Sequence, residues 1–249
     1  MPVLNMAQWV GLVSEALGVI GVVLLLGLSP RLRRVPPVQF QYPRREGLLS
    51  LALGGGMVAL AFLMAAQPAT AQEIQRGGAG GLYPALSLAA LAGVLSGAAL
   101  VYRRQPPRSA GWGRPLLGPA LQIGVAVGLL SIFLRGMTTR LLSGVSAEAA
   151  QALLILLAIA AGEETLFRGY LQPRFAAWLG ALPGWLLSAA LFVLYQAPRI
   201  ILLPAEKQWT GWGVTALHSL LAGWMMMKVR HAAAPALYRA ISGWLLFLL

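Results

Sequence analysis

Two adjacent glutamates in the second half of the chain carry the clearest chemical signal. Glu163 and Glu164 follow an apolar run that begins at Leu153, and Arg168 comes four residues after Glu164. In a helix this spacing and order favour an ion pair between Glu164 and Arg168, whereas Glu163 is rotated by about 100° and cannot share that arginine equally. A desolvated carboxylate without a counter-charge suits a general base that activates water. The residues alone leave a second interpretation open, in which the three charges only cap a membrane span at the headgroups.

The composition excludes a soluble protein. Hydrophobic residues make up 58% of the 249 residues and charged residues only 10%, whereas soluble chains carry about 25% charged residues because water must solvate their surface. The formal net charge of +12 would indicate nucleic acid in a soluble protein, but here it is typical of cytoplasmic loops between membrane spans. The chain has no cysteine, which excludes a disulfide, a thiolate nucleophile and Cys-bound zinc. We therefore expect the lipid bilayer as a partner and no nucleic acid.

Eight apolar stretches are long enough, some of them marginally, for membrane-spanning helices, which need about 20 apolar residues. They are 8–28, 48–67, 84–102, 116–136, 147–166, 184–197, 211–228 and 232–249. If the connection between the first two is cytoplasmic, that side receives thirteen Lys and Arg residues, at positions 31, 33, 34, 44, 45, 103, 104, 108, 114, 168, 174, 228 and 230. The other side receives five, at positions 76, 135, 140, 199 and 207. This asymmetry predicts an all-α, polytopic transmembrane helix bundle of about eight spans, with both termini outside the cytoplasm.

Ionisable residues inside spans are costly and are therefore functional candidates. Besides the glutamate cluster, Glu15, His218 and Arg239 lie inside predicted spans. We expect Glu15 near the outer surface, where its carboxylate reaches the headgroups, and His218 in a hydrogen bond between helices. His231 belongs to the basic turn after the seventh span, and we expect it at the membrane interface.

The run Glu163-Glu164-x3-Arg168-Gly169, followed by Tyr170-Leu171-Gln172, resembles the first signature of the CPBP family. These are the CAAX-processing and bacteriocin-processing intramembrane proteases, also called Abi proteins. The resemblance implies that Glu163 activates a water for attack on a peptide bond and that Glu164 and Arg168 support it. In the family, two histidines from F-x3-H and H-x3-N signatures complete the site, and the asparagine helps to stabilise the oxyanion. The family has been described both as metalloproteases and as metal-independent glutamate proteases.

This chain departs from the family pattern at three positions. Phe192 matches the second signature, but Gln196 stands at its histidine position. In the third signature Arg239 replaces the histidine and Gly243 the asparagine. Glutamine takes up no proton near neutral pH and binds metals poorly, arginine cannot ligate a cation, and glycine offers no side-chain donor. We therefore expect no zinc or other metal cofactor, and an ion pair between Arg239 and Glu163 in the former active site.

The resemblance covers residues 145–249 as a CPBP/Abi-like core and leaves 1–140 as an N-terminal transmembrane region of about four spans. It implies an intramembrane endopeptidase with reduced or lost activity, whose site lies at the cytoplasmic side of a bacterial cytoplasmic membrane. The alternative is a catalytically inactive pseudoprotease that binds or escorts a membrane peptide or protein. A transporter with a pathway lined by Glu and Arg fits less well. The substitutions leave open whether the protein is an enzyme, and no residue indicates a substrate.

Overall fold

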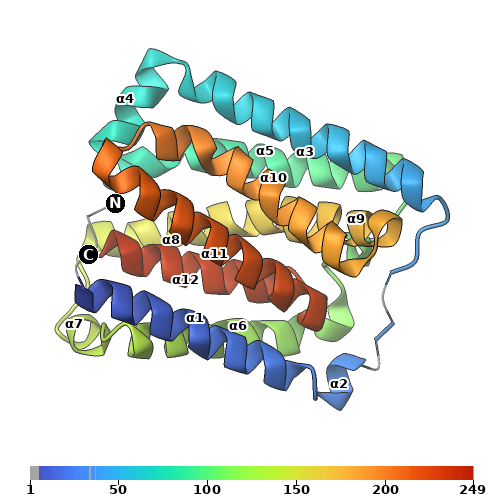
Figure 1. Ribbon diagram of the computed structural model, residues 1–249, viewed down its shortest axis with the longest axis horizontal. Coiled ribbons are helices and arrows are strands. Elements are labelled where there is room, and N and C mark those ends of the chain that lie inside the picture. The colour runs from blue at the N-terminus through green and yellow to red at the C-terminus, as the bar shows by residue number, and fades with distance from the viewer. Residues whose placement is uncertain (1–5, 34, 37, 249) are drawn as a thin grey trace.

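The computed structural model describes residues 6–33, 35–36 and 38–248, and all regular elements in these ranges are helical (Figure 1). Eight helices of at least 15 residues form the bundle: α1 (Met6–Leu26), α3 (Pro43–Ala65), α5 (Tyr83–Tyr102), α6 (Arg114–Leu134), α8 (Ala147–Glu164), α10 (Ala181–Ile201), α11 (Ala205–Val229) and α12 (Ala233–Phe247). The shorter elements are α2 (Pro30–Arg33), α4 (Pro68–Arg76), η1 (Gly80–Leu82), η2 (Pro107–Ala110), α7 (Thr138–Leu142), η3 (Thr165–Leu171) and α9 (Gln172–Leu179). The predicted all-α bundle is confirmed.

Within the described ranges, six helical segments are long and apolar enough to cross a membrane by themselves. They are Gln8–Leu26, Pro43–Ala65, Gly80–Tyr102, Pro107–Leu134, Ala147–Leu179 and Ala181–Ile201. The seventh and eighth predicted spans correspond to α11 and α12, which pack against α10 and against α6 and α8, respectively; Leu249, the end of the eighth prediction, lies outside the described residues. The protein is therefore an integral, multi-pass membrane protein.

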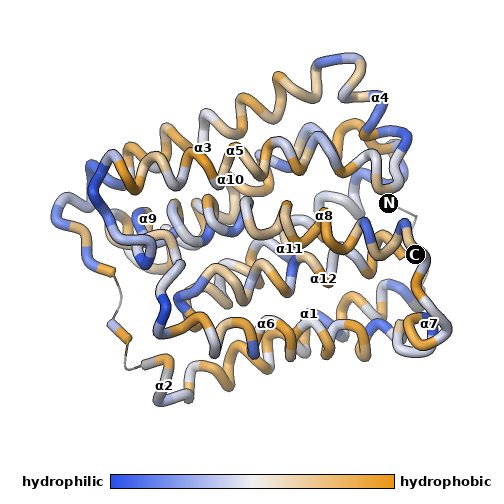
Figure 2. The backbone as a smooth tube through the Cα atoms, turned by 180° about the vertical axis from the view of Figure 1, so that it is seen from behind, coloured by the Kyte–Doolittle hydropathy of each residue, from blue (hydrophilic) through white to orange (hydrophobic). Residues whose placement is uncertain are grey.

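The outer faces of the helices are apolar, as a lipid environment requires. Large apolar side chains such as Val10, Leu63, Phe133 and Leu154 are more than half exposed. The hydropathy of the backbone tube follows the same pattern, because apolar colour runs along the helices and polar colour gathers at the two ends (Figure 2). Since each helix satisfies its own backbone hydrogen bonds, these faces need only hydrocarbon around them.

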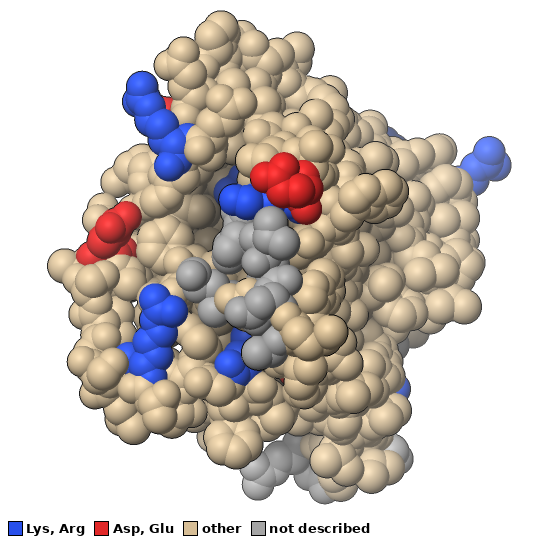
Figure 3. All heavy atoms as spheres, turned by 60° about the vertical axis from the view of Figure 1, so that its left-hand side comes forward, with Lys and Arg blue, Asp and Glu red and all other residues tan. Residues whose placement is uncertain are grey.

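The two ends of the bundle differ in charge. One end carries α2, α9 and the arginine-rich connections, and we call it the basic end; the opposite end carries α4, α7, the start of α1 and the end of α12 (Figure 1). Arg168 and Arg174 are fully buried and Arg135 is nearly so. Without these three residues, the sequence count is eleven basic residues on one side and four on the other; Arg34 lies outside the described residues. On the face shown in Figure 3, basic and acidic side chains are both present and lie in separate places. The excess of Lys and Arg residues at the basic end therefore remains.

The fifth helical segment is longer than predicted. Instead of ending near residue 166, the helix continues through the π-helical η3 into α9, so that the whole segment runs over Ala147–Leu179. Glu163 lies next to the last residue of α8 and consequently halfway along the longer helical segment. The reason is that Gly169 and the charged Arg168 and Arg174 face protein and not headgroups. A π-helical turn of this kind is frequent at functional sites.

Helices α5 and α8 are in close contact at Gly162. A Cβ at Gly162 would lie 2.2 Å from the carbonyl oxygen of Ala89, a backbone atom that cannot rotate away. We expect Gly162→Ala to lower the free energy of unfolding by about 1–3 kcal/mol, seen as a lower Tm in detergent. Gly93→Ala is the matched control, because nothing lies within 4 Å of a Cβ there. Equal Tm values for the two variants would contradict the close approach.

Candidate functional site

Three helices bring a buried cluster of charged and polar side chains together. Glu163 on α8 is fully buried, and its Oε1 accepts a hydrogen bond of 2.9 Å from the Gln196 amide on α10. Its Oε2 accepts one of 2.8 Å from Arg239 on α12. Both oxygens of this carboxylate are thus held by donors that come from the positions where the family signatures carry histidines.

Arg239 joins the two glutamates. Its Nη1 donates to Glu164 Oε1 at 2.6 Å while its Nη2 donates to Glu163. The predicted pair within α8 is also present but longer, since Arg168 Nε lies 3.5 Å from Glu164 Oε2. Two buried carboxylates are therefore balanced by two arginines, which is how charges are tolerated inside a membrane protein.

The ring of Phe192 lies beside both guanidinium groups of the cluster. The Cζ of Arg168 is 4.5 Å from the ring centroid and that of Arg239 is 4.2 Å away. Arg168 also donates to the carbonyl and hydroxyl oxygens of Ser219 on α11. Cation–π contacts of this kind stabilise buried cations, so Phe192 and Ser219 help to fix the orientation of both arginines.

Gly243, the substituted asparagine position, adds no functional group. It lies one turn after Arg239 on α12, and a Cβ there would face Leu156 of α8 at 3.8 Å. The structure therefore brings Glu163, Glu164, Arg168, Phe192, Gln196 and Arg239 together, and it offers no side-chain donor from Gly243. The catalytic roles assigned to these residues stay predictions.

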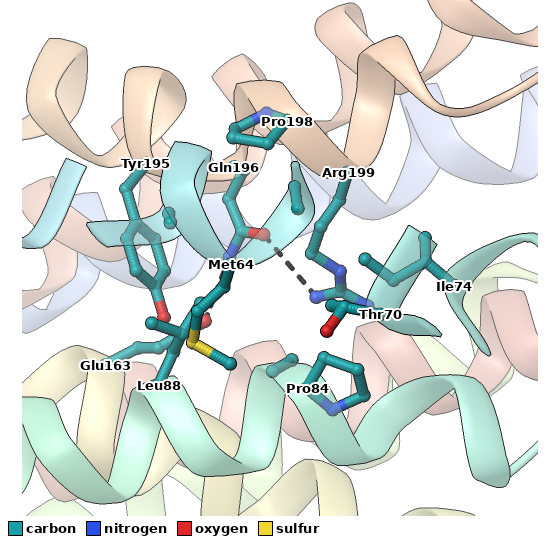
Figure 4. A pocket seen from close by; sticks show the side chains of 13 residues that line it. Met64, Thr70, Ile74, Pro84, Leu88, Glu163, Tyr195, Gln196, Pro198 and Arg199 are labelled. Atoms are coloured by element: carbon teal, nitrogen blue, oxygen red, sulfur yellow. Dashed lines mark hydrogen bonds between the residues drawn. The ribbon is translucent and has the colours of Figure 1, made fainter. Parts of the chain in front are cut away.

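A narrow pocket reaches the cluster from the side of α4 (Figure 4). It is lined by Ala61, Met64, Ala65, Thr70, Ile74, Pro84, Ala85, Leu88, Glu163, Tyr195, Gln196, Pro198 and Arg199. The Tyr195 hydroxyl points toward Glu163, and Arg199 extends over the pocket with its Nη1 3.5 Å from the Gln196 amide oxygen (Figure 4). The sequence interpretation missed Tyr195 and Arg199, although an arginine three residues after Gln196 was a signal.

The residues around Glu163 do not fit a metal ion. Within the described part of the chain, no three His, Asp or Glu side chains form a group that could hold one. The two neighbours of Glu163 are an amide, which is a weak ligand, and a permanent cation, which repels a metal. These residues therefore give Glu163 no partner that would share a metal ion with it.

A second buried ion pair corrects the expectation for Glu15. Its carboxylate is only 1% exposed and pairs with Arg135 at the end of α6, whose Nη2 also donates to Ser242 Oγ at 2.7 Å. His218 Nε2 lies 3.0 Å from the same Ser242 hydroxyl, so the predicted hydrogen bond between helices exists. The carboxylate is thus not at the headgroups, because an arginine more than a hundred residues away in the sequence balances it inside the bundle.

His231 lies in the turn between α11 and α12 and is buried within the protein. It is 1% exposed, its Nδ1 accepts a hydrogen bond of 3.1 Å from the backbone N–H of Ala233, and the edge of its ring meets Trp112. Burial lowers the pKa of His231 in the turn between α11 and α12. The imidazole thus accepts a hydrogen bond from the first residue of α12 and does not extend among the charged side chains of the basic turn.

A family model matches the segment of the chain that carries the glutamate cluster. The family model described as type II CAAX prenyl endopeptidase Rce1-like matches residues 144–245, a segment that contains all the residues of the glutamate cluster. No curated protein and no solved structure matches the chain. Residues 144–245 are therefore similar to the Rce1-like family of CAAX prenyl endopeptidases, in agreement with the resemblance that the glutamate motif predicted.

Proposed function

We propose that this protein is a membrane pseudoprotease: a CAAX protease-like protein that binds a membrane peptide or protein without cleaving it. The observation that carries the proposal is the position of Arg239, whose guanidinium donates to both Glu163 and Glu164. In the family pattern this position carries a histidine, and here it carries a permanent cation. The former catalytic glutamate is therefore an ion-pair partner.

The chemistry of peptide-bond hydrolysis supports this proposal. A general base must take a proton from water, but both carboxylate oxygens of Glu163 already accept hydrogen bonds, one from the Gln196 amide and one from Arg239. Gln196 cannot replace a histidine in proton transfer. A missing oxyanion donor, as at Gly243, typically costs about 10²–10³ in rate.

One observation favours a competing function, a metal-independent endopeptidase of low activity. Glu163 borders the pocket, so a water molecule can approach it from the side of Tyr195. In that case Arg239 would stabilise negative charge in the transition state. The two functions differ in whether the charge of Glu163 matters for turnover.

The test is a cleavage assay on the protein in liposomes with membrane peptides, including a prenylated CAAX peptide. We expect the wild-type protein and Glu163→Gln to show the same background rate, because the charge of Glu163 performs no catalytic work. The combined substitution Gln196→His, Arg239→His and Gly243→Asn restores the family pattern and is expected to raise the rate by about 10². Cleavage by the wild-type protein that Glu163→Gln abolishes would overturn the proposal.

The charge asymmetry supports a cytoplasmic location for the basic end of the bundle. The location in a bacterial cytoplasmic membrane stays a prediction. So does the identity of the membrane partner, for which the pocket at Glu163 provides the starting point.

A further inference from the structure

The pocket at Glu163 belongs to the opposite end of the bundle. Its walls come from the end of α3, from α4, from the start of α5 and from the end of α10, with Thr70 and Ile74 on α4. In Figure 1 these parts lie at the end that carries the start of α1 and the end of α12, away from α2 and α9. The approach to Glu163 therefore starts at the end with few basic residues.

Residues 105–112, which we call the plug, pack against η3 at the basic end of the bundle. Within it, Ser109 and Ala110 are 1% and 0% exposed although they lie in a connection between two spans. Arg174 Nη1 donates to the Ser109 carbonyl at 3.0 Å, and Trp112 Nε1 donates to Thr165 Oγ1 at 2.9 Å. The plug is thus tied to the helical turn that directly follows Glu164.

Two glycines lie where the plug contacts its neighbours, Gly169 in η3 and Gly111 in the plug itself. A Cβ at Gly169 would lie 2.1 Å from the carbonyl oxygen of Ala110. Gly111 has a φ of +77°, a conformation that favours glycine, and its carbonyl accepts a hydrogen bond of 2.9 Å from the Ala232 N–H. The lack of a side chain at Gly169 of the glutamate motif therefore allows the plug to pack directly against η3.

Arg199 gives the pocket a charge preference. Its side chain extends over the pocket between Gln196 and Thr70 (Figure 4). Among the described residues it has no ion-pair partner, and its contact is the long hydrogen bond to the Gln196 amide. The other walls of the outer pocket are apolar or uncharged, so the cation at the mouth attracts a negatively charged group.

We propose that the pocket is an outward-facing binding site, which opens away from the basic end and takes an anionic group, a carboxylate or a phosphate, at Arg199. This inference rests on the proposed function only in treating the pocket as the place where a ligand binds. It reverses the expected cytoplasmic side of the site, because the plug packs against η3 on that side.

The natural lack of cysteine makes the direction of access measurable with single-cysteine variants. Thr70→Cys places a thiol in the pocket, and Ser109→Cys places one in the plug by exchanging a single atom. Arg76→Cys and Arg108→Cys are exposed controls for the two ends. Membrane-impermeant methanethiosulfonate reagents are added to right-side-out and to inside-out vesicles, and the fraction of labelled protein is followed over time.

We expect Thr70→Cys to react in right-side-out vesicles together with Arg76→Cys, and Ser109→Cys to stay unreactive in inside-out vesicles in which Arg108→Cys reacts. Reaction of Thr70→Cys from the side of Arg108→Cys would overturn the outward opening, and so would its failure to react from either side. Fast reaction of Ser109→Cys would overturn the packing of the plug against η3. None of these outcomes depends on whether the protein cleaves peptides, so a failure here is distinct from a failure of the pseudoprotease proposal.

The charge preference is tested at the same thiol. The anionic sulfonatoethyl reagent should label Thr70→Cys about fivefold faster than the cationic trimethylammonium reagent, after each rate is normalised to Arg76→Cys. Adding Arg199→Gln should bring this ratio close to one, and an unchanged ratio would overturn the role of Arg199. Protection by added octanoate in phosphatidylcholine vesicles would identify a soluble anion as the source of the ligand group, and protection by phosphatidylglycerol in the bilayer a lipid headgroup. If neither protects, the anion site is refuted.

Discussion

Replacing Arg239 with methionine is expected to lower the free energy of unfolding by about 3–5 kcal/mol, because it leaves buried charges without their partner. Glu163 and Glu164 are fully buried, and Arg239 donates to each of them at 2.8 and 2.6 Å. After the substitution, Arg168 alone would face two carboxylates, and its nearest approach to one of them is 3.5 Å. The measurement is the Tm of the purified protein in detergent.

A rescue separates the effect of charge from the effect of packing. Glu163→Gln in the Arg239→Met background removes the one excess negative charge while keeping the size of the side chain, so the Tm should recover in part. Arg76→Met is the matched control, since that arginine is exposed on α4, and its Tm should stay within a degree or two of the wild-type value. A double variant no more stable than Arg239→Met would show that shape, and not charge, holds the cluster together.

Arg174→Met is expected to have a comparable effect, about 3 kcal/mol or more, at the basic end. The Arg174 side chain is fully buried. Its guanidinium donates to Glu46 Oε2 at 3.2 Å and to the carbonyl oxygens of Ser109 and Tyr170 at 3.0 and 2.8 Å, and it stacks on the Tyr170 ring at 3.5 Å. Its loss leaves these acceptors buried and unpaired, and it frees the plug. The loss is measured by Tm and by faster labelling of Ser109→Cys from the basic end.

Arg174→Lys is the informative comparison. Lysine keeps the charge near Glu46 but cannot reproduce the planar fork that serves several acceptors at once. We expect an intermediate Tm, and labelling of Ser109→Cys between that of the wild-type protein and that of Arg174→Met. If lysine restored both properties completely, the charge at position 174 would be sufficient and the hydrogen bonds to the plug would have no role.

The sequence was sufficient for the contacts of the glutamate cluster, because they follow from local spacing and from short signatures. The i,i+4 relation predicted the Glu164–Arg168 pair, and the signature positions predicted that Gln196 and Arg239 would meet Glu163. The geometry agrees in each case. Hydropathy likewise predicted the helices, since a span is a continuous local feature of the chain.

What the sequence could not supply depends on contacts between distant segments. Glu15 looked interfacial because its partner Arg135 stands at the far end of another span, and no local pattern joins them. Arg174 looked like a loop charge for the same reason, because its partner Glu46 belongs to the N-terminal region. The burial of Ser109 could not be predicted either, because a polar connection between spans is ordinarily solvated.

The π-helical turn η3 decides how the two halves of the fifth helical segment face the rest of the protein. Its wider winding accommodates one residue more than an α-helical turn would, and in an α-helix one residue corresponds to a rotation of about 100°. The angle about the helix axis between the side chains of Glu163, before the turn, and Arg174, after it, therefore differs from the angle in a uniform α-helix. In this one helical segment, the Glu163 carboxylate contacts α10 and α12, and the Arg174 guanidinium contacts α3. A uniform α-helix of the same length would not point the two side chains in these directions.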